Sequence, residues 1–248
     1  MRIILTKPNI LILLLGAIFV SAFLTALPVV AEAPQSTLGL RVQTAETHAK
    51  ITPEVALTLL KEGNQRFVSG KMYKRDLRKK ALITSKGQYP YAAIVGCIDS
   101  RASHELLFDA GIGDIFSARV AGNFANTDIL GSLEFATAIA DAKLIVVLGH
   151  SECGAIKGAC DNLKMGNLTH TLSNIAPAIY SVEGFEGKRN SKNKAFVDAV
   201  AHANVELTVE HIVEASPIIK ALSDKRQLMV VGAMLDIVTG KVTFMEPS

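Results

Sequence analysis

Short apolar runs alternate with longer segments of helical periodicity along most of this chain. Four runs have the length and the β-branched content of buried strands: 91–98, 115–120, 144–148 and a run that begins at 228. Between and after them, helical spacing of apolar residues covers 104–110, 127–141, 153–165 and 195–222. Strands that alternate with helices indicate an α/β fold with parallel strands. Residues 241–245, which follow a Thr-Gly turn, can add a short edge strand.

The N-terminal residues have a different pattern. Arg2 and Lys7 precede an apolar run at 10–27, and small residues follow it up to Ala33. This arrangement is typical of a secretory signal peptide, with cleavage predicted after Ala31. The run also reaches the lower limit of a membrane span, so an uncleaved anchor is the alternative. Either way, the remainder is predicted to be exported to a periplasm or to the outer face of an inner membrane.

The residues after this segment divide into a leader and one domain. Residues 32–52 have no periodicity and are predicted to be a flexible leader. An amphipathic helix is predicted to begin at Pro53 and to end at Gly70. The chain of 248 residues is short enough for a single domain, which we place at 53–248, after segments 1–31 and 32–52.

Composition excludes several classes of protein. Hydrophobic residues make up 49% and charged residues 20%, which excludes disorder for most of the chain. The net charge of +3 comes without basic blocks, so nothing favours a nucleic-acid partner. With 3 cysteines a dense disulfide framework is excluded, and each cysteine has to be interpreted separately.

Reactive side chains follow two of the predicted strands. Cys97, Asp99 and Arg101 come at the end of the first, and His150 and Cys153 follow the third. Ligands of α/β proteins bind beyond the carboxyl ends of the strands, so these side chains can meet there. Two thiolates and an imidazole suit zinc and leave a fourth position open, as in a catalytic site. The spacing alone also permits inert core cysteines or a Cys97–Cys153 disulfide.

Three longer motifs surround these residues. They are Cys-Ile-Asp-Ser-Arg at 97–101, Gly-Asp-Ile-Phe at 113–116 with Arg-Val-Ala-Gly-Asn at 119–123, and Leu-Gly-His-Ser-Glu-Cys-Gly-Ala at 148–155. In these motifs the chain resembles the β-class carbonic anhydrases, specifically their bacterial branch. Weaker similarity extends the resemblance over roughly 53–245.

The resemblance implies a metal site and an assembly. It implies one Zn²⁺ per chain on Cys97, His150 and Cys153, with Asp99 and Arg101 as a catalytic dyad. It also implies a mainly parallel four-stranded core, a homodimer or tetramer whose N-terminal helix contacts the partner, and an active site near that interface.

Two positions depart from the family pattern. Ser103-His104 stands where the family often has a Pro-Pro pair, and Leu235 stands where it often has Tyr. The ligands are untouched by these departures, but the rim of the pocket can differ.

The implied reaction is the hydration of carbon dioxide to bicarbonate and a proton. Zinc lowers the pKa of bound water to about 7 in favourable sites, which provides hydroxide at neutral pH. Asp99 can orient that hydroxide, and Arg101 can hold Asp99 off the metal. Gly122 and Gly154 can permit close approach of backbone to the substrate, although glycine is more often a turn residue. His104 can relay the proton, or it can be an ordinary capping or surface histidine.

Other functions remain compatible with the sequence. A zinc protein without activity could bind bicarbonate or a partner, but the intact Asp99 and Arg101 argue against it. The same site could hydrolyse carbonyl sulfide or carbon disulfide, depending on the width of the pocket. A thiol–disulfide protein would need neither His150 nor Asp99. Contact with a membrane is expected only through an uncleaved N-terminal segment.

Overall fold

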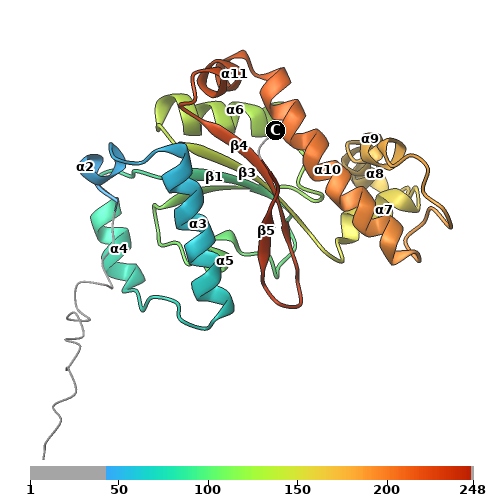
Figure 1. Cartoon of the computed structure of the whole chain (residues 1–248), viewed down its shortest axis with the longest axis horizontal. Helices are drawn as coiled ribbons and strands as arrows, with labels where there is room; N and C mark the ends of the chain where they lie inside the picture. Colours follow the sequence, from blue (N-terminus) through green and yellow to red (C-terminus); the bar gives the residue numbers. More distant parts are fainter. Residues whose placement is uncertain (1–42, 247–248) are drawn as a thin grey trace, which may run out of the picture. The chain divides into compact units, whose positions relative to one another are not determined.

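A computed structural model of the protein describes residues 43–246, so the predicted signal segment 1–31 lies outside the described residues. The described part contains a five-stranded sheet in the order β2-β1-β3-β4-β5 (Figure 1). The strands are β1 (Ala92–Gly96), β2 (Ile115–Arg119), β3 (Leu144–His150), β4 (Met229–Leu235) and β5 (Val242–Phe244). The first four are parallel and β5 pairs antiparallel with β4. The predicted parallel core and short edge strand are confirmed.

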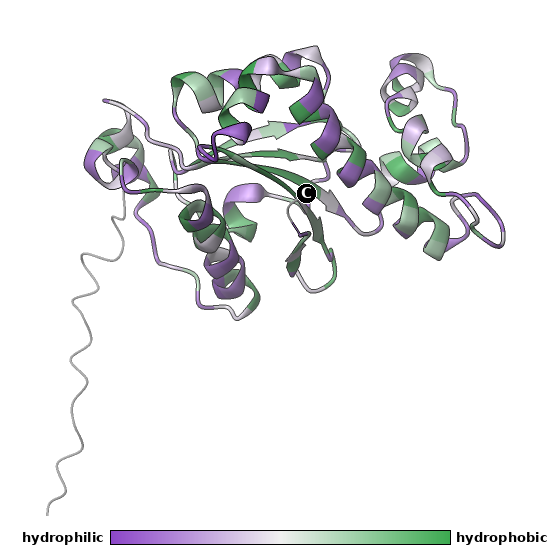
Figure 2. Ribbon diagram, turned by 45° about the horizontal axis from the view of Figure 1, so that its top comes forward, coloured by the Kyte–Doolittle hydropathy of each residue, from purple (hydrophilic) through white to green (hydrophobic). Residues whose placement is uncertain are grey.

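Helices cover both faces of the sheet. Ile94, Leu144 and Val146 pack on one face against helix α3 (Pro53–Val68) and the short helix α5 (His104–Leu107). Ala93 and Ile145 point to the opposite face, towards α6 (Thr127–Glu134), α10 (Lys194–Ala215) and α11 (Pro217–Asp224). Because both faces are buried, the central strands are apolar throughout instead of alternating, and Figure 2 shows them as the most hydrophobic part of the ribbon.

The helices begin and end largely where the pattern predicts. They are α3 (Pro53–Val68), α5 (His104–Leu107), α6 (Thr127–Glu134) with a π turn η1 (Phe135–Ile139), α7 (Gly154–Cys160), α10 (Lys194–Ala215) and α11 (Pro217–Asp224). The single helix predicted at 195–222 is wrong, because Pro217 begins a separate helix. Its cap is Ser216, whose hydroxyl accepts a 3.2 Å hydrogen bond from the Ile219 N–H.

Four helices are absent from the sequence-based prediction: α2 (Ala45–His48), α4 (Leu77–Thr84), α8 (Gly166–Ser173) and α9 (Ala176–Ser181). The first of them lies inside the segment interpreted as a leader. There His48 is buried, and its Nε2 lies 3.2 Å from the Pro90 carbonyl oxygen. None of the helices within residues 43–246 is long and apolar enough to cross a membrane.

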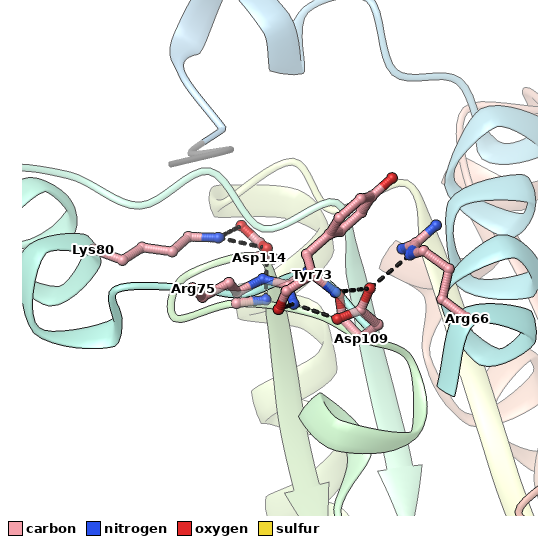
Figure 3. Close-up of polar contacts among 7 residues, drawn as sticks. Arg66, Tyr73, Arg75, Lys80, Asp109 and Asp114 are labelled. Carbon is pink, nitrogen blue, oxygen red and sulfur yellow. Dashed lines mark hydrogen bonds and ion pairs between the residues drawn. The ribbon is translucent and has the colours of Figure 1, made fainter. Parts of the chain in front are cut away.

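A group of paired charges lies where the strands begin, and we call it the amino-edge cluster: Arg66, Arg75, Lys80, Asp109 and Asp114 (Figure 3). The buried Asp109 carboxylate accepts a 2.6 Å bond from Arg66 Nε and a second bond from Arg75 Nη1. Lys80 Nζ donates to both oxygens of Asp114, at 2.7 and 2.6 Å. These pairs tie α3 and α4 to the edge of the sheet.

Candidate metal centre

The three predicted ligands meet at the carboxyl edge of the sheet. Cys97 directly follows β1, His150 is the last residue of β3, and Cys153 precedes α7. Because β1 and β3 are parallel neighbours, the side chains after them share one edge. One ligand atom from each of the three residues lies within 4.8 Å of the others, and all three residues are buried.

The donor atoms are arranged for a metal. The Sγ atoms of Cys97 and Cys153 stand 3.9 Å apart and both thiols are free. A disulfide bond is only about 2.05 Å long, so the two cysteines are not cross-linked. Nδ1 of His150 lies 2.9 Å from the Ser151 carbonyl oxygen, which can only accept, so Nδ1 carries the proton and Nε2 has a free lone pair. Within residues 43–246, Nε2 is buried and has no hydrogen-bond partner.

The charges of the site favour a cation. A hydrogen bond from the Cys153 thiol lowers the pKa of Cys97 far below its ordinary value, despite burial. The Cys97 thiolate and burial in turn raise the pKa of Cys153. Burial opposes charging of His150, but the nearby Cys97 thiolate raises the pKa of the ring overall. Two thiols this close can both ionise only beside a cation, and two thiolates with an imidazole are a donor set that fits zinc.

Asp99 and Arg101 form a bidentate pair near these donors. Nε and Nη2 of Arg101 donate to the two carboxylate oxygens of Asp99 at 2.9 and 2.8 Å, and the Arg101 backbone N–H adds a 3.0 Å bond. These contacts hold the pKa of Asp99 well below its usual range. The carboxylate is therefore ionised at neutral pH, and both of its oxygens accept hydrogen bonds from Arg101.

Comparison with known proteins agrees with this geometry. Residues 92–242 match the sequence profile of the carbonic anhydrase family. Carbonic anhydrase 2 of Mycobacterium tuberculosis is 33% identical over 196 residues, which cover 76% of this chain and 91% of that protein. The carbonic anhydrase of Mycolicibacterium smegmatis is 42% identical over 118 residues, 47% of this chain and 57% of that protein.

Solved structures of β-class enzymes share the fold. A tetrameric β-carbonic anhydrase of Sordaria macrospora has a TM-score of 0.59 and 28% identity, over 66% of this chain and 84% of that one. The Coccomyxa enzyme, solved with acetazolamide, has a TM-score of 0.59 and 26% identity, over 77% of this chain and 87% of that one. This chain belongs to the β-class carbonic anhydrases. As a member of this class it is a lyase, a carbonate dehydratase.

Arg119 and Gly122, which lie in the second motif, shape the loops around the candidate metal centre of this carbonic anhydrase. Arg119 donates from Nε to the Cys97 carbonyl oxygen at 2.9 Å and from Nη2 to the Asp99 carbonyl oxygen at 2.6 Å, so it braces the loop after β1. Gly122 has a φ of 89°, and its N–H lies 3.4 Å from Cys97 Sγ. A Cβ at Gly122 would lie 2.5 Å from Ile175 Cδ1, so the close approach there requires glycine.

Gly154 does not share this crowding. A Cβ built on Gly154 would meet no heavy atom within 4 Å. Within residues 43–246, packing against other protein atoms therefore does not itself require glycine at this position. A contact between Gly154 and substrate stays a prediction.

His104 does not lie at the mouth of the site. The residue has 0% exposure, and its Nδ1 lies 2.6 Å from Ser117 Oγ. Its ring fills the space beside Gly96, where a Cβ would lie 2.1 Å from Nε2. Burial lowers the pKa of His104 to about 4. A buried ring that stays neutral cannot pass protons to buffer, so the relay interpretation of His104 is wrong.

Proposed function

We propose that this protein catalyses the reversible hydration of carbon dioxide to bicarbonate with one zinc ion per chain. The observation that carries the proposal is the convergence of three buried donor atoms beside an ionised carboxylate. Asp99 follows Cys97 by two residues, and Arg119 donates to the backbone carbonyl oxygens of both, which supports a position of the carboxylate beside the donor set. Family membership supports the same reaction.

The metal and the chain contribute different chemistry. Zinc, when bound, lowers the pKa of water so that hydroxide is available at neutral pH. Asp99 accepts a hydrogen bond from the O–H of that nucleophile and directs its lone pair towards carbon dioxide. Arg101 keeps Asp99 ionised and engages both carboxylate oxygens, so Asp99 does not bind the metal in place of water. The Ser151 carbonyl oxygen keeps the proton of His150 on Nδ1 and Nε2 free for the metal.

Replacement of single cysteines tests the ligand set. Cys153→Ala should lose zinc and hydration activity together, because three protein ligands do not tolerate the loss of one. Cys160→Ala is the matched control, since Cys160 is a free cysteine of α7 that is not part of the donor set. It should retain one zinc per chain and the parental rate. Stoichiometric zinc in Cys153→Ala would exclude these ligands.

We also propose that the chain forms a homodimer, or a tetramer built from such dimers. Helix α4 buries Lys80 and exposes three apolar side chains, those of Leu77, Leu82 and Ile83. The sheet edge formed by β2 is flanked by a groove of about 750 Å³ whose lining includes Phe135. These apolar surfaces suit a second copy, and the tetrameric state of the Sordaria macrospora relative supports an assembly.

The assembly can be tested by charge insertion. Phe135 is 52% exposed, and Phe135→Glu should shift the sedimentation coefficient to that of a monomer. Tyr180, on α9, is 77% exposed and lies outside this groove, so Tyr180→Glu is the control and should leave the assembly intact. A Phe135→Glu protein that sediments like the parent would contradict an interface at β2.

We further propose that residues 1–31 direct export. The support is the basic start followed by the apolar run at 10–27 and small residues. Intact mass of the protein from a periplasmic fraction should correspond to a chain that begins at Glu32. A full-length mass recovered only from membranes would instead establish an uncleaved anchor.

A further inference from the structure

A buried amide from outside the sequence motifs is linked to the candidate metal centre through one residue, Gly122. Asn204 lies in the middle of α10 and is 3% exposed. This helix packs against β3 and β4, and Figure 1 shows it beside the sheet between α11 and α7. The Nδ2 of Asn204 donates a 2.8 Å hydrogen bond to the carbonyl oxygen of Gly122. The backbone N–H of Gly122 in turn points at Cys97 Sγ, 3.4 Å away.

Gly122, which makes both of these contacts, belongs to a strained turn. Gly122 has a φ of 89° and Asn123 a φ of 45°, so two consecutive residues are in the left-handed region. The turn is closed by a 3.0 Å bond from the Asn123 N–H to the Val120 carbonyl oxygen. A conformation of this kind persists only when its surroundings hold it. Asn204 supplies such a hold from a rigid helix on the other side of the turn.

We propose that Asn204 is a positioning residue that sets the hydrogen bond from Gly122 to the Cys97 thiolate. The carbonyl and the N–H of Gly122 belong to successive peptide groups that meet at its Cα. The amide anchors the second group, and this holds Gly122 at the φ of 89° at which its N–H lies towards Cys97 Sγ. An N–H donor withdraws negative charge from a thiolate, so it makes the sulfur a weaker donor to a metal and a weaker nucleophile. A metal that receives less charge from its ligands is a stronger Lewis acid. Asn204 therefore acts on the acidity of the centre without touching it. The inference rests on the proposed ligand set.

The decisive measurement is spectroscopic and uses the full chain loaded with cobalt(II) in place of zinc. Cobalt–thiolate sites absorb in the near ultraviolet by charge transfer from sulfur, and the energy of this band falls when the sulfur loses a hydrogen bond. Asn204→Leu removes the donor at similar volume, so its band should move to longer wavelength. Alkylation of the metal-bound thiolate should also become about threefold faster. A threefold change in rate is smaller than the full effect of one hydrogen bond to a charged acceptor.

The chain provides a matched control in another buried amide. Asn64 of α3 is 5% exposed, and its Nδ2 donates to the carbonyl oxygens of Leu107 and Gly240 at 3.0 and 2.9 Å. Asn64→Leu should lower the melting temperature but leave the cobalt spectrum and the alkylation rate unchanged. A purely structural role for Asn204 would give the same result in both variants.

The outcomes separate this inference from the ligand assignment. If Asn204→Leu does not fold, Asn204→Ala removes the amide without adding branched bulk and is measured in its place. An unshifted band and an unchanged alkylation rate in the folded variant would overturn the role of Asn204. Absence of any sulfur-to-cobalt band in the unsubstituted protein would instead contradict the metal site itself.

Discussion

Buried polar groups lie at both the amino and the carboxyl edge of the sheet. The groups at the amino edge are paired with one another, whereas the carboxyl edge has a buried ring nitrogen without a partner within residues 43–246. In the amino-edge cluster, Asp109 and Asp114 each accept bonds from cationic side chains at close range. At the carboxyl edge, two thiols and a ring nitrogen converge on one another, and the His150 Nε2 has no partner within residues 43–246.

This difference distinguishes a structural cluster from a functional one. Buried charges that are fully paired within the chain hold elements together and have no capacity left for a ligand. A buried polar atom without a partner, as His150 Nε2 is within residues 43–246, costs stability unless a ligand satisfies it. The carboxyl edge is therefore where function is expected, although both clusters are rich in titratable side chains.

The largest effect on stability is expected from Asp109→Ala. The variant leaves the guanidinium groups of Arg66 and Arg75 without their carboxylate, and breaking a buried pair typically costs about 3–5 kcal/mol. Chemical denaturation should show this loss in the free energy of unfolding. The folded fraction should still contain one zinc per chain. Loss of zinc from folded Asp109→Ala would mean that the two edges are not independent.

Acid should destabilise the protein through His104. Its pKa is about 4 in the folded chain, because of burial first and the charge of Arg119 second, against 6.5 as the ordinary value. Above pH 6.5 the ring is neutral in both states and contributes no pH dependence. Between pH 6.5 and pH 4 the unfolded chain binds a proton that the folded chain does not. The free energy of unfolding therefore decreases by about 3 kcal/mol in total as the pH is lowered through this range.

A variant without a titratable ring isolates this contribution. His104→Gln should show a smaller loss of unfolding free energy over the same pH range than the parent protein. Equal losses in the two proteins would contradict a buried neutral His104.

Arg101→Ala is expected to separate metal binding from catalysis. Without the bidentate contact, the Asp99 carboxylate can compete with water for the metal, so hydration should fall by about 10- to 100-fold while zinc content stays complete. In Asp99→Ala, activity should fall without carboxylate ligation. X-ray absorption at the zinc edge, with and without azide, distinguishes the two variants. Near-parental turnover and azide exchange in Arg101→Ala would return this pair to a structural role.

The smallest effect is expected for an exposed pair. Lys220 Nζ lies 3.1 Å from an Asp224 carboxylate oxygen on α11, with side-chain exposures of 56% and 62%. Solvent screens such a pair, so Lys220→Ala should change the free energy of unfolding by less than about 0.5 kcal/mol. A cost similar to that of Asp109→Ala would show that burial is not what distinguishes the amino-edge cluster.

The features that depend on short-range pattern and spacing were predictable from the sequence. The strands were predictable because both of their faces are buried, which leaves continuous apolar runs. The positions of Cys97, His150 and Cys153 at strand ends that share one edge indicated that their side chains can meet, whereas their identification as zinc ligands came from the resemblance to the β-class carbonic anhydrases. Helix α4 was missed because its pattern is inverted: Lys80 points inwards and Leu82 is 71% exposed.

Long-range partners could not be predicted in the same way. Asn204 is one of several polar residues of α10, and nothing near it in the sequence indicates Gly122 as its partner. The burial of His104 depends on Ser117 and on the absence of a Cβ at Gly96, which are known only once β1 and β2 pair. Such contacts follow from the packing of elements and not from the local pattern.

A catalytic zinc centre is tested by zinc content and the rate of carbon dioxide hydration, measured together on one reduced and purified sample of the protein. We expect one zinc per chain and rapid hydration that disappears when a chelator removes the metal and returns when zinc is restored. Stoichiometric zinc without hydration would contradict the catalytic role of Asp99 and Arg101, and hydration that persists without zinc would contradict the metal centre.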